Sequence, residues 1–343
     1  MLTAAIIGAS GYTGAELLRL LAAHPTFDVT VATGDSQAGT PLRELYPSLA
    51  AAYGDRRFDE VDVAAAAEAD VVFLGLPHGA SQGIVPALRA AGAKRIVDLA
   101  ADFRLKDPAL YPRWYHDEHQ APELLADFVY GLPEIYREQL AGASLVATPG
   151  CYPTAGTLSL LPVARAGLID RSGIIVDAAS GVSGAGRPPK AHTTFCTVDE
   201  DFTAYGLLDH RHTPEMEMLL DATVLFTPHL APMNRGILAT SYARPAPGRE
   251  AELSTGALLE LYREFYADEP FVVVTDGSPS TKATLGSNVA QVTVRHDERT
   301  GYVVGICAID NLTKGASGAA VQCANLICGL PETTGLPIVG VYP

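Results

Sequence analysis

The sequence predicts an α/β protein with two domains: a doubly wound parallel sheet, then an α+β domain whose sheet is mostly antiparallel or mixed. The length fits, because 343 residues correspond to two domains of about 150 residues each. The order of elements also fits, because strand-like and helical runs alternate in the first half, whereas strand-like runs dominate the second. Hydrophobic residues make up 48% and charged residues 18% of the chain, which supplies two cores and excludes a disordered protein.

The first domain, expected to comprise residues 1–150 and 314–343, contains uninterrupted apolar runs. Such runs are typical of parallel strands that are covered on both faces. Their alternation with helical segments predicts βαβ units, and we expect the last helix to return to this domain. The expected strands are 3–7, 27–32, 71–76, 95–99 and 144–148, and the expected helices are 12–23, 64–69, 80–91 and 317–328.

The second domain, expected to comprise residues 151–313, is mainly strand-like. Two long helices and a shorter one beginning near Pro214 interrupt the strands, which predicts a mixed or largely antiparallel sheet. The expected strands are 173–178, 224–226, 237–242, 271–274, 289–294 and 302–309, and the long helices are 151–165 and 250–266.

The charge balance excludes several classes of partner. Lys and Arg number 24 and Asp and Glu 39, giving a net charge of 24 − 39 = −15, which argues against nucleic acid and anionic membranes. No basic residue precedes the N-terminal apolar run, and residues 140–164 are broken by Gly and Pro, so we expect neither a signal peptide nor a membrane span. Five cysteines are too few for a disulfide framework. We therefore expect a soluble, cytoplasmic protein with a small-molecule substrate.

A glycine-rich turn joins the first expected strand to the first expected helix. Gly8, Gly11 and Gly14 have the spacing G-x-x-G-x-x-G and enclose Ser10, Tyr12 and Thr13. Glycines let the backbone turn sharply and approach a pyrophosphate, whose charge is met by the helix N-terminus. The position predicts a Rossmann-type cofactor site; the alternative is a tight turn without a ligand.

The end of the second expected strand bears on the choice between NAD and NADP. Asp35 lies about 20 residues after the glycine turn, where a carboxylate hydrogen-bonds a ribose hydroxyl and repels a 2′-phosphate. It equally fits a solvent-facing turn residue. Ser36 follows it, and Arg43 is the nearest cation that could hold a 2′-phosphate. These residues leave both cofactors open.

Cys151 is the expected nucleophile. It follows a strand and begins a helix, where the helix dipole and free N–H groups favour the thiolate over the thiol. Pro153 fits the first helical turn, because its missing N–H costs nothing there. A buried, inert cysteine is the alternative, and the other four cysteines lie in runs typical of core or loop.

Residues 210–215 are the expected acid/base segment. They contain His210, Arg211, His212 and Glu215, and imidazole exchanges protons near neutral pH. The alternatives are a solvated loop and a zinc site, but the spacing matches no metal-binding motif. We therefore expect no metal.

Two further segments carry cations that could hold an anion against the negative overall charge. The loop at 180–187 contains Ser183, Gly184 and Arg187, with Lys190 just beyond it, and its small residues could form an anion-binding nest. Arg104 follows a strand at its carboxyl end, where ligands bind in open α/β sheets. A flexible surface loop and an exposed salt bridge are the respective alternatives.

In these segments the chain resembles the N-acetyl-gamma-glutamyl-phosphate reductases, relatives of the aspartate-semialdehyde dehydrogenases. The resemblance spans nearly the whole chain, and ordered blocks of this length are more specific than any single motif. The blocks are 8–14, 76–79, 98–106, 130–134, 149–154, 180–187, 210–215, 234–236 and 308–322.

The resemblance implies a function. It implies NADPH-dependent reduction of N-acetyl-gamma-glutamyl phosphate to N-acetylglutamate 5-semialdehyde and phosphate through a Cys151 thioester, in arginine biosynthesis. It places the family's histidine-rich segment on residues 210–215, and we favour His212 as the acid/base, with His210 and Glu215 facing the substrate. It also places Asn311 in a block beside the nicotinamide, and implies a homo-oligomer.

One departure and several alternatives accompany the resemblance. Many relatives have Ser-Arg where this chain has Gly34-Asp35, so NADP is expected but NAD is not excluded. Related enzymes reduce a carrier-bound aminoadipyl phosphate in lysine biosynthesis; the negative charge of this chain argues against an acidic carrier. A cysteine hydrolase and a non-catalytic nucleotide-binding module are the remaining alternatives.

Overall fold

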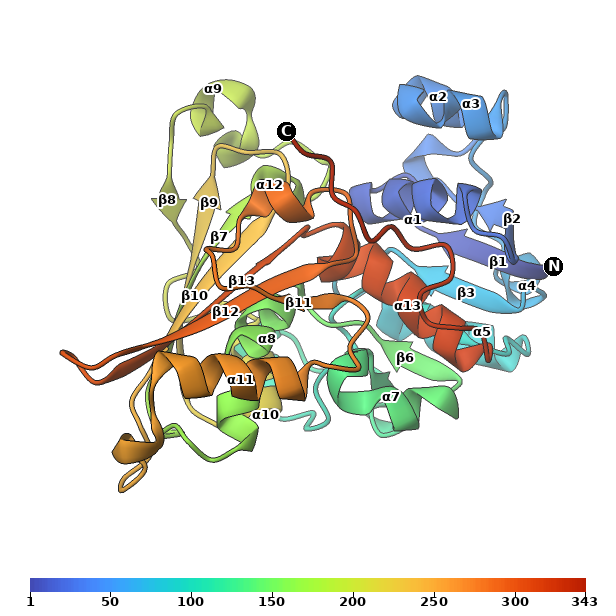
Figure 1. The fold of residues 1–343 in the computed structure, drawn as a ribbon. Helices are drawn as coiled ribbons and strands as arrows, with labels where there is room; N and C mark the ends of the chain where they lie inside the picture. The colour runs from blue at the N-terminus through green and yellow to red at the C-terminus, as the bar shows by residue number, and fades with distance from the viewer. The chain divides into compact units, whose positions relative to one another are not determined.

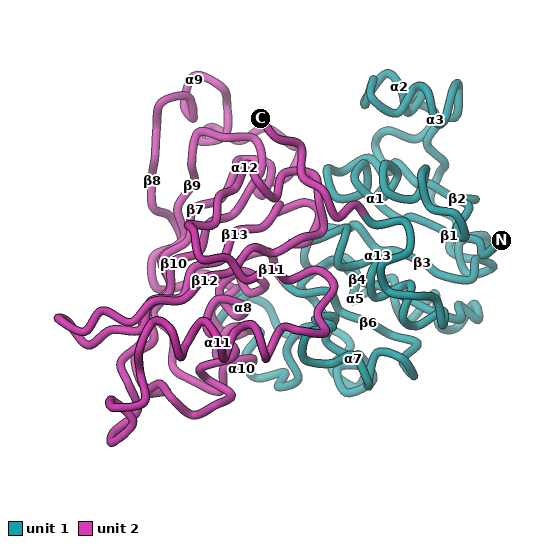
Figure 2. The backbone as a smooth tube through the Cα atoms, viewed as in Figure 1, with its two compact units in different colours: residues 1–149, 316–336 teal, residues 150–315, 337–343 magenta.

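The computed structural model describes residues 1–343 and forms two compact units (Figure 2). Unit 1 comprises residues 1–149 and 316–336, and unit 2 comprises residues 150–315 and 337–343. The expected boundaries differ from this division at Gly150, at residues 314–315 and at the C-terminal segment 337–343. That last segment joins unit 2 because Asn288 N–H donates to the Pro337 carbonyl and Val341 N–H donates to the Leu285 carbonyl, both at 2.8 Å.

Unit 1 contains a six-stranded sheet in the order β2-β1-β3-β4-β6-β5, and every pair in it is parallel. This confirms the predicted doubly wound sheet. β5 was not predicted, because a two-residue strand carries no periodicity. The strands are β1 (Leu2–Ile7), β2 (Phe27–Ala32), β3 (Val71–Leu74), β4 (Ile96–Asp98), β5 (Val129–Tyr130) and β6 (Leu145–Ala147).

The helices of unit 1 include one from the C-terminal part of the chain. This helix, α13 (Gly318–Ile327), packs against α1 and α7 (Figure 1), and nine of its residues are buried. The others are α1 (Tyr12–Ala22), α2 (Leu42–Leu45), α3 (Ala50–Tyr53), α4 (Val63–Ala67), α5 (Ser81–Ala90), α6 (Leu110–Tyr115) and α7 (Pro133–Ala141).

Unit 2 contains a seven-stranded sheet in the order β11-β12-β13-β10-β7-β9-β8. It is mixed as predicted, because β11 with β12 and β7 with β9 are parallel pairs while the other neighbours are antiparallel. The strands are β7 (Ile174–Gly181), β8 (Thr203–Ala204), β9 (Val224–Ala231), β10 (Ile237–Ala243), β11 (Val272–Val274), β12 (Ala290–Asp297) and β13 (Tyr302–Ile309).

Helix α8 (Cys151–Arg165) forms the centre of unit 2, and its bounds are those predicted. Every residue from 152 to 164 is buried, and the helix packs against β10, β13 and α10. A helix that is apolar on all sides is typical of a core position. Its first residue, Cys151, is partly exposed, and its last residue, Arg165, is exposed.

The remaining helices of unit 2 include one whose start was predicted too early. The expected helix 250–266 is a short 3₁₀ turn (Glu250–Glu252) followed by α11 (Thr255–Phe265). Ser254 separates them, because its side chain accepts a hydrogen bond from Ala257 N–H and caps α11. The others are α9 (Phe195–Val198), α10 (Thr213–Leu220) and α12 (Thr281–Thr284), and a π-helical turn spans Thr313–Ser317. None of the helices in either unit is long and apolar enough to span a bilayer.

Candidate active site

A pocket of about 260 Å³ opens at the N-terminus of α8, and all of its walls come from unit 2. It brings together residues from segments as far apart in the sequence as Cys151 and Leu230. The predicted residues among its walls are Cys151, Gly184, Lys190, His210 and His212. The other walls are Tyr152, Ser180, Gly181, Ala185, His192, Tyr205, Arg211 and Leu230.

The environment of Cys151 follows from the start of α8. Gly150 is in extended conformation (φ −66°, ψ 152°) and precedes the helix without a side-chain cap. The positive end of the helix dipole therefore lies at Cys151, and it stabilises a negative charge on sulfur. The side chain is partly exposed and lines the pocket. The thiol is thus accessible to a small molecule in that pocket.

Glu215 connects the nucleophile's helix to His212. Its side chain is fully buried, and Oε2 accepts a hydrogen bond of 3.0 Å from Gly150 N–H. Its Oε1 lies 4.0 Å from His212 Nε2. We expected Glu215 to face the substrate, but it is absent from the pocket walls and is directed at the backbone before Cys151.

The two histidines differ in role. His212 N–H donates to His210 Nδ1 at 3.2 Å, so this nitrogen of His210 acts as an acceptor. Burial and the Arg211 charge lower the pKa of His210 to about 4, which keeps His210 neutral near pH 7. The His212 ring lies directly beside the Gly150 Cα, because a Cβ added there would be 2.6 Å from Nε2.

Tyr152 and Tyr205 also line the pocket, and the sequence analysis did not single them out. Tyr152 and Tyr205 share a hydrogen bond of 3.0 Å between their hydroxyl groups, and the Tyr152 hydroxyl lies 3.1 Å from the His229 carbonyl oxygen. Burial raises the pKa of Tyr205 to about 12 and raises that of Tyr152 as well. Both tyrosines are therefore neutral near pH 7. No group of three or more His, Cys, Asp or Glu side chains in the chain has a geometry suited to a metal ion.

Asn311 organises the loop that closes the pocket. Its amide nitrogen donates to the Ser183 hydroxyl at 2.9 Å, and its oxygen accepts from Gly236 N–H at 2.7 Å. These bonds hold the 3₁₀ turn Val182–Ala185, which carries Gly184 into the pocket wall. Lys190 lines the pocket and Arg187, which is half-buried, does not.

The glycine turn in unit 1 has the features that a pyrophosphate requires. Gly8 has φ +90°, and a Cβ there would lie 2.5 Å from the Gly75 carbonyl oxygen. A Cβ at Gly14 would lie 2.4 Å from the Ala9 Cα. Helix α1 has no side-chain N-cap and no acidic residue in its first turn, so its N-terminus suits an anion. These residues fit a dinucleotide.

The strand order places this turn at the switch point of the sheet. The chain passes from β1 to β2 on one side and then crosses to β3 on the other, and ligands bind at the carboxyl ends of strands at such a point. Ser10 in this turn donates from its hydroxyl to the Gly34 carbonyl at 3.0 Å. Tyr12 and Thr13 begin α1.

The residues after β2 do not add a cation for a 2′-phosphate. Asp35 has φ +46° and begins a 3₁₀ turn that includes Ser36, and both residues are exposed. Arg43 makes an ion pair of 2.6 Å with Asp55 at the surface.

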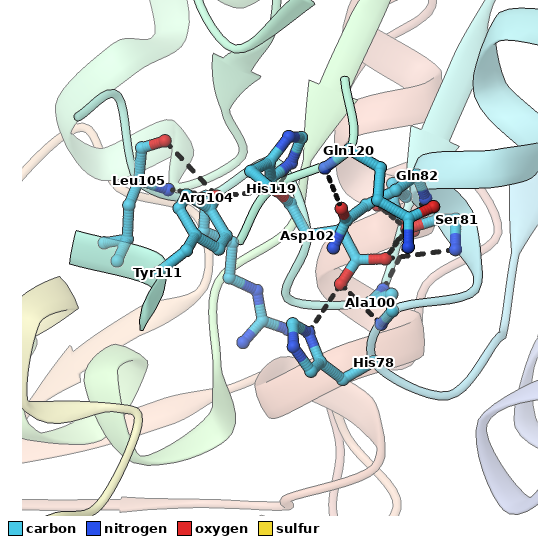
Figure 3. A network of polar contacts seen from close by, with 12 residues as sticks. His78, Ser81, Gln82, Ala100, Asp102, Arg104, Leu105, Tyr111, His119 and Gln120 are labelled. Atoms are coloured by element: carbon cyan, nitrogen blue, oxygen red, sulfur yellow. Dashed lines mark hydrogen bonds and ion pairs between the residues drawn. The ribbon is translucent and has the colours of Figure 1, made fainter. Parts of the chain in front are cut away.

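Arg104 lies in unit 1 at the end of a buried polar network (Figure 3). Its guanidinium donates to the Leu99 carbonyl at 2.9 Å, and it is 6% exposed. Asp102, two residues earlier, is fully buried and pairs with His78. Burial opposes ionisation of Asp102, but bonds from His78, Gly79 and Ser81 outweigh it and lower the pKa to about 2. The carboxylate is therefore charged at neutral pH.

Comparison with known proteins identifies the family. Residues 3–143 match the family model "Semialdehyde dehydrogenase, NAD binding domain", and residues 151–311 match "Semialdehyde dehydrogenase, dimerisation domain". A protein of Geobacter sulfurreducens is 49% identical over the full length of both chains, and one of Symbiobacterium thermophilum is 50% identical over 98% of each. Both are N-acetyl-gamma-glutamyl-phosphate reductases. The chain belongs to this family.

Solved structures confirm the fold of the wider semialdehyde dehydrogenase group. An aspartate semialdehyde dehydrogenase of Vibrio cholerae, complexed with ASA, matches with a TM-score of 0.71 and 17% identity, covering 96% of this chain and 98% of that one. The enzyme of Candida albicans with NADP has a TM-score of 0.72 and 17% identity, and covers 96% and 99%. The family thus combines a nucleotide-binding parallel sheet with a mixed-sheet domain, as the two units do.

Sequence reasoning missed some residues around these sites. Tyr205 follows the two-residue strand β8 (Thr203–Ala204) and belongs to no motif, and only the fold brings it to the pocket. Tyr152 follows the predicted nucleophile directly, so its place in the wall could have been predicted from that position. His78 belongs to a block noted for its resemblance to the family, but no local pattern predicted its contact with Asp102.

Proposed function

We propose that this protein reduces N-acetyl-gamma-glutamyl phosphate to N-acetylglutamate 5-semialdehyde and phosphate, with NADPH as the reductant, in arginine biosynthesis. The observation that carries the proposal is Cys151 at the uncapped start of α8, in a pocket with His212 and Lys190. Full-length relatives with about half of their residues identical carry the name of this enzyme. None of the other four cysteines lines this pocket.

The first step is formation of a thioester on Cys151. The thiolate, stabilised by the α8 dipole, attacks the acyl carbon of the substrate, a carbon–sulfur bond forms, and the carbon–oxygen bond to phosphate breaks. Phosphate leaves as the anion, and Lys190, Arg187 and Arg104 are the basic residues proposed to bind the substrate's anionic groups. Ser183 is proposed to hydrogen-bond the substrate in the same loop.

The second step converts the thioester to the aldehyde. When bound, a nicotinamide cofactor supplies the hydride that reduces the acyl carbon. His212 donates a proton to the developing oxyanion and takes it back as the thiohemiacetal collapses, which breaks the carbon–sulfur bond and regenerates the thiolate. His210, which is neutral near pH 7, lines the pocket together with His212. Glu215 is proposed to position His212 and the backbone at Gly150.

The cofactor is proposed to bind at residues 8–14. Gly8, Gly11 and Gly14 allow the backbone to approach the pyrophosphate, and the α1 N-terminus meets its charge. Ser10, Tyr12, Thr13 and Ser36 are proposed to line the same site, and Gly184 and Asn311 are proposed as further cofactor-binding residues. NADP is proposed as the cofactor because the resemblance to the family implies it. Asp35 is the residue that most favours NAD, because a carboxylate at that position repels a 2′-phosphate. We also propose that the protein is a homo-oligomer in the cytoplasm.

A single assay tests this proposal. N-acetylglutamate semialdehyde is mixed with inorganic phosphate and NADP, and NADPH formation is followed by absorbance. Phosphate-dependent reduction is expected, with NAD tested in parallel. Activity only with an aminoadipate-derived semialdehyde would assign the lysine pathway instead. Ester hydrolysis without any nucleotide would instead indicate a cysteine hydrolase.

A further inference from the structure

Residues 34–59 form a closed loop after β2, here called the β2 loop, which includes α2 and α3 (Figure 1). Its two ends are held together at the carboxyl end of the strand. Gly34 N–H donates to the Asp59 carbonyl at 3.0 Å, and Asp59 N–H donates to the Ala32 carbonyl at 2.9 Å. Ligands of parallel sheets bind at this end of the strands, so the β2 loop begins and ends beside the proposed cofactor site.

The glycine turn is joined to the β2 loop by two hydrogen bonds, and both involve Ser10. The Ser10 hydroxyl donates to the Gly34 carbonyl at 3.0 Å. The Ser10 carbonyl accepts from the Tyr46 hydroxyl at 2.7 Å. The first bond holds the beginning of the loop and the second holds its middle, 36 positions from Ser10 in the sequence. The turn and the loop are therefore held together at two points.

The backbone of Tyr46 is fixed within the β2 loop. Tyr46 ends α2 in an extended conformation (φ −134°, ψ 86°), which is the conformation that the following Pro47 favours. Its N–H donates to the Leu42 carbonyl at 2.8 Å, and its carbonyl accepts from Leu49 N–H at 3.0 Å. Both backbone polar groups of Tyr46 are thus bonded inside the loop, which fixes the point from which its side chain reaches Ser10.

The bond from Tyr46 acts on the peptide unit at the centre of the glycine turn. The Ser10 carbonyl and Gly11 N–H belong to one planar peptide, so a partner on the carbonyl also sets the direction of the N–H. Gly11 N–H donates to the Gly8 carbonyl at 3.2 Å and closes the turn. A donor on the carbonyl strengthens the bond that the same peptide makes through its N–H. The Tyr46 hydroxyl therefore stabilises the closed form of the turn.

We propose that Tyr46 is a positioning residue of the cofactor site, which acts through the peptide between Ser10 and Gly11 on the turn that receives the pyrophosphate. The inference rests on the proposed function, which requires a dinucleotide. A turn that is already closed does not lose conformational entropy when the pyrophosphate binds, so the cofactor binds more tightly. Because Tyr46 acts on the turn, its hydroxyl affects the affinity for the dinucleotide and not the chemical step on Cys151.

Tyr53 is a matched control in the same loop. Its hydroxyl donates to the Leu18 carbonyl at 2.8 Å, and Leu18 lies inside α1, beyond the glycine turn. Both Tyr46 and Tyr53 are half-buried, and each gives its hydroxyl to a backbone carbonyl. A change to Phe removes one such bond in either case and keeps the ring. We therefore expect the two variants to lose similar stability, whereas only Tyr46→Phe alters the glycine turn.

The experiment compares Tyr46→Phe and Tyr53→Phe in the full-length protein. The Kd values for NADPH and NADH are measured by fluorescence titration without substrate, and melting temperatures are measured without cofactor. For Y46F we expect the Kd of the dinucleotide that binds more tightly to rise roughly three- to tenfold, the effect of losing one hydrogen bond. The kcat at saturating cofactor and the KM for the semialdehyde should stay unchanged. Y53F should bind the dinucleotide as the unsubstituted protein does.

Three results would overturn the positioning role of Tyr46. An unchanged Kd in Y46F shows that the turn needs no support from the loop, and an equal rise in Y46F and Y53F shows that the loop only adds stability. A lower kcat with an unchanged Kd places Tyr46 in the chemical step. These results leave the proposed function intact, because the unsubstituted protein then still binds a dinucleotide. If the unsubstituted protein binds neither NADPH nor NADH, the proposed function itself fails and the role of Tyr46 fails with it.

Discussion

The carboxylate of Glu215 accepts a hydrogen bond of 3.0 Å from the backbone N–H of Gly150, the residue directly before Cys151. The two residues are 65 positions apart, and their contact joins the start of α10 to the start of α8. The same carboxylate lies 4.0 Å from His212 Nε2. Glu215 therefore fixes the nucleophile's turn and the proposed acid/base relative to each other.

Glu215→Gln tests this relationship. Gln keeps the size of the side chain and can still accept from Gly150 N–H, but it removes the charge that faces His212. We expect kcat to fall roughly ten- to hundredfold with little change in KM, because the lost interaction acts on the proton transfer. The measurement is the steady-state assay across pH. Glu217→Gln on the same helix is the control, and an equal loss there would contradict the assignment.

Cys151→Ser tests the nucleophile. The hydroxyl is far less ionised and less nucleophilic than the thiol at this position, so we expect activity to fall by at least about a thousandfold. The substituted protein should still bind NADPH. Cys196→Ser is the matched control, because Cys196 is an exposed free cysteine of the same unit. Comparable turnover by the Cys151→Ser protein would contradict the mechanism.

Gly315→Ala tests the packing behind the nucleophile. A Cβ at position 315 would lie 2.8 Å from the Cys151 Cβ and 3.3 Å from its Cα, so the start of α8 must shift. We expect at least a tenfold loss of kcat and a loss of about 1–3 kcal/mol in the free energy of unfolding. Activity and urea unfolding measure the two effects. Gly256→Ala, where an added Cβ meets nothing within 4 Å, should leave activity unchanged and slightly stabilise α11.

The pH dependence of stability should reflect Asp98. Burial and the neighbouring Asp102 raise the pKa of Asp98 from 3.8 to about 7. Between these values the folded protein holds a proton that the unfolded chain has released, so this carboxyl makes stability fall as pH rises. The contribution is complete below pH 3.8 and is lost as pH passes through about 7, with a slope of up to about 1.4 kcal/mol per pH unit.

Asp98→Asn removes this titration. We expect its free energy of unfolding to decline less than that of the unsubstituted protein between pH 5 and pH 7, as measured by urea unfolding at each pH. Ser81 Oγ lies 2.9 Å from Asp98 Oδ2 and 2.7 Å from Asp102 Oδ2, so its proton can go to the ionised Asp102 while its oxygen accepts from the amide nitrogen of the substituted residue. Parallel pH curves for the two proteins would show that Asp98 ionises normally in the fold.

Several parts of the fold were predictable because their signals are local. The glycine turn follows a strand and precedes a helix, so its conformation depends on neighbouring residues alone. Helix α8 has the predicted bounds because Gly150 and Pro153 mark its start and an apolar run continues it. The start of α11 was missed because Ser254, a capping residue, lies inside a segment whose helical periodicity extends further in both directions.

The sequence by itself determined the two kinds of sheet, the cofactor turn and the position of Cys151 at a helix start, because each depends on periodicity or on residues adjacent in the chain. Only the tertiary structure decided that Glu215 faces Gly150, that Tyr205 lines the pocket and that Asp102 orients His78. Such contacts join residues far apart in sequence. Their geometry is set by how strands and helices pack, and no local propensity encodes it.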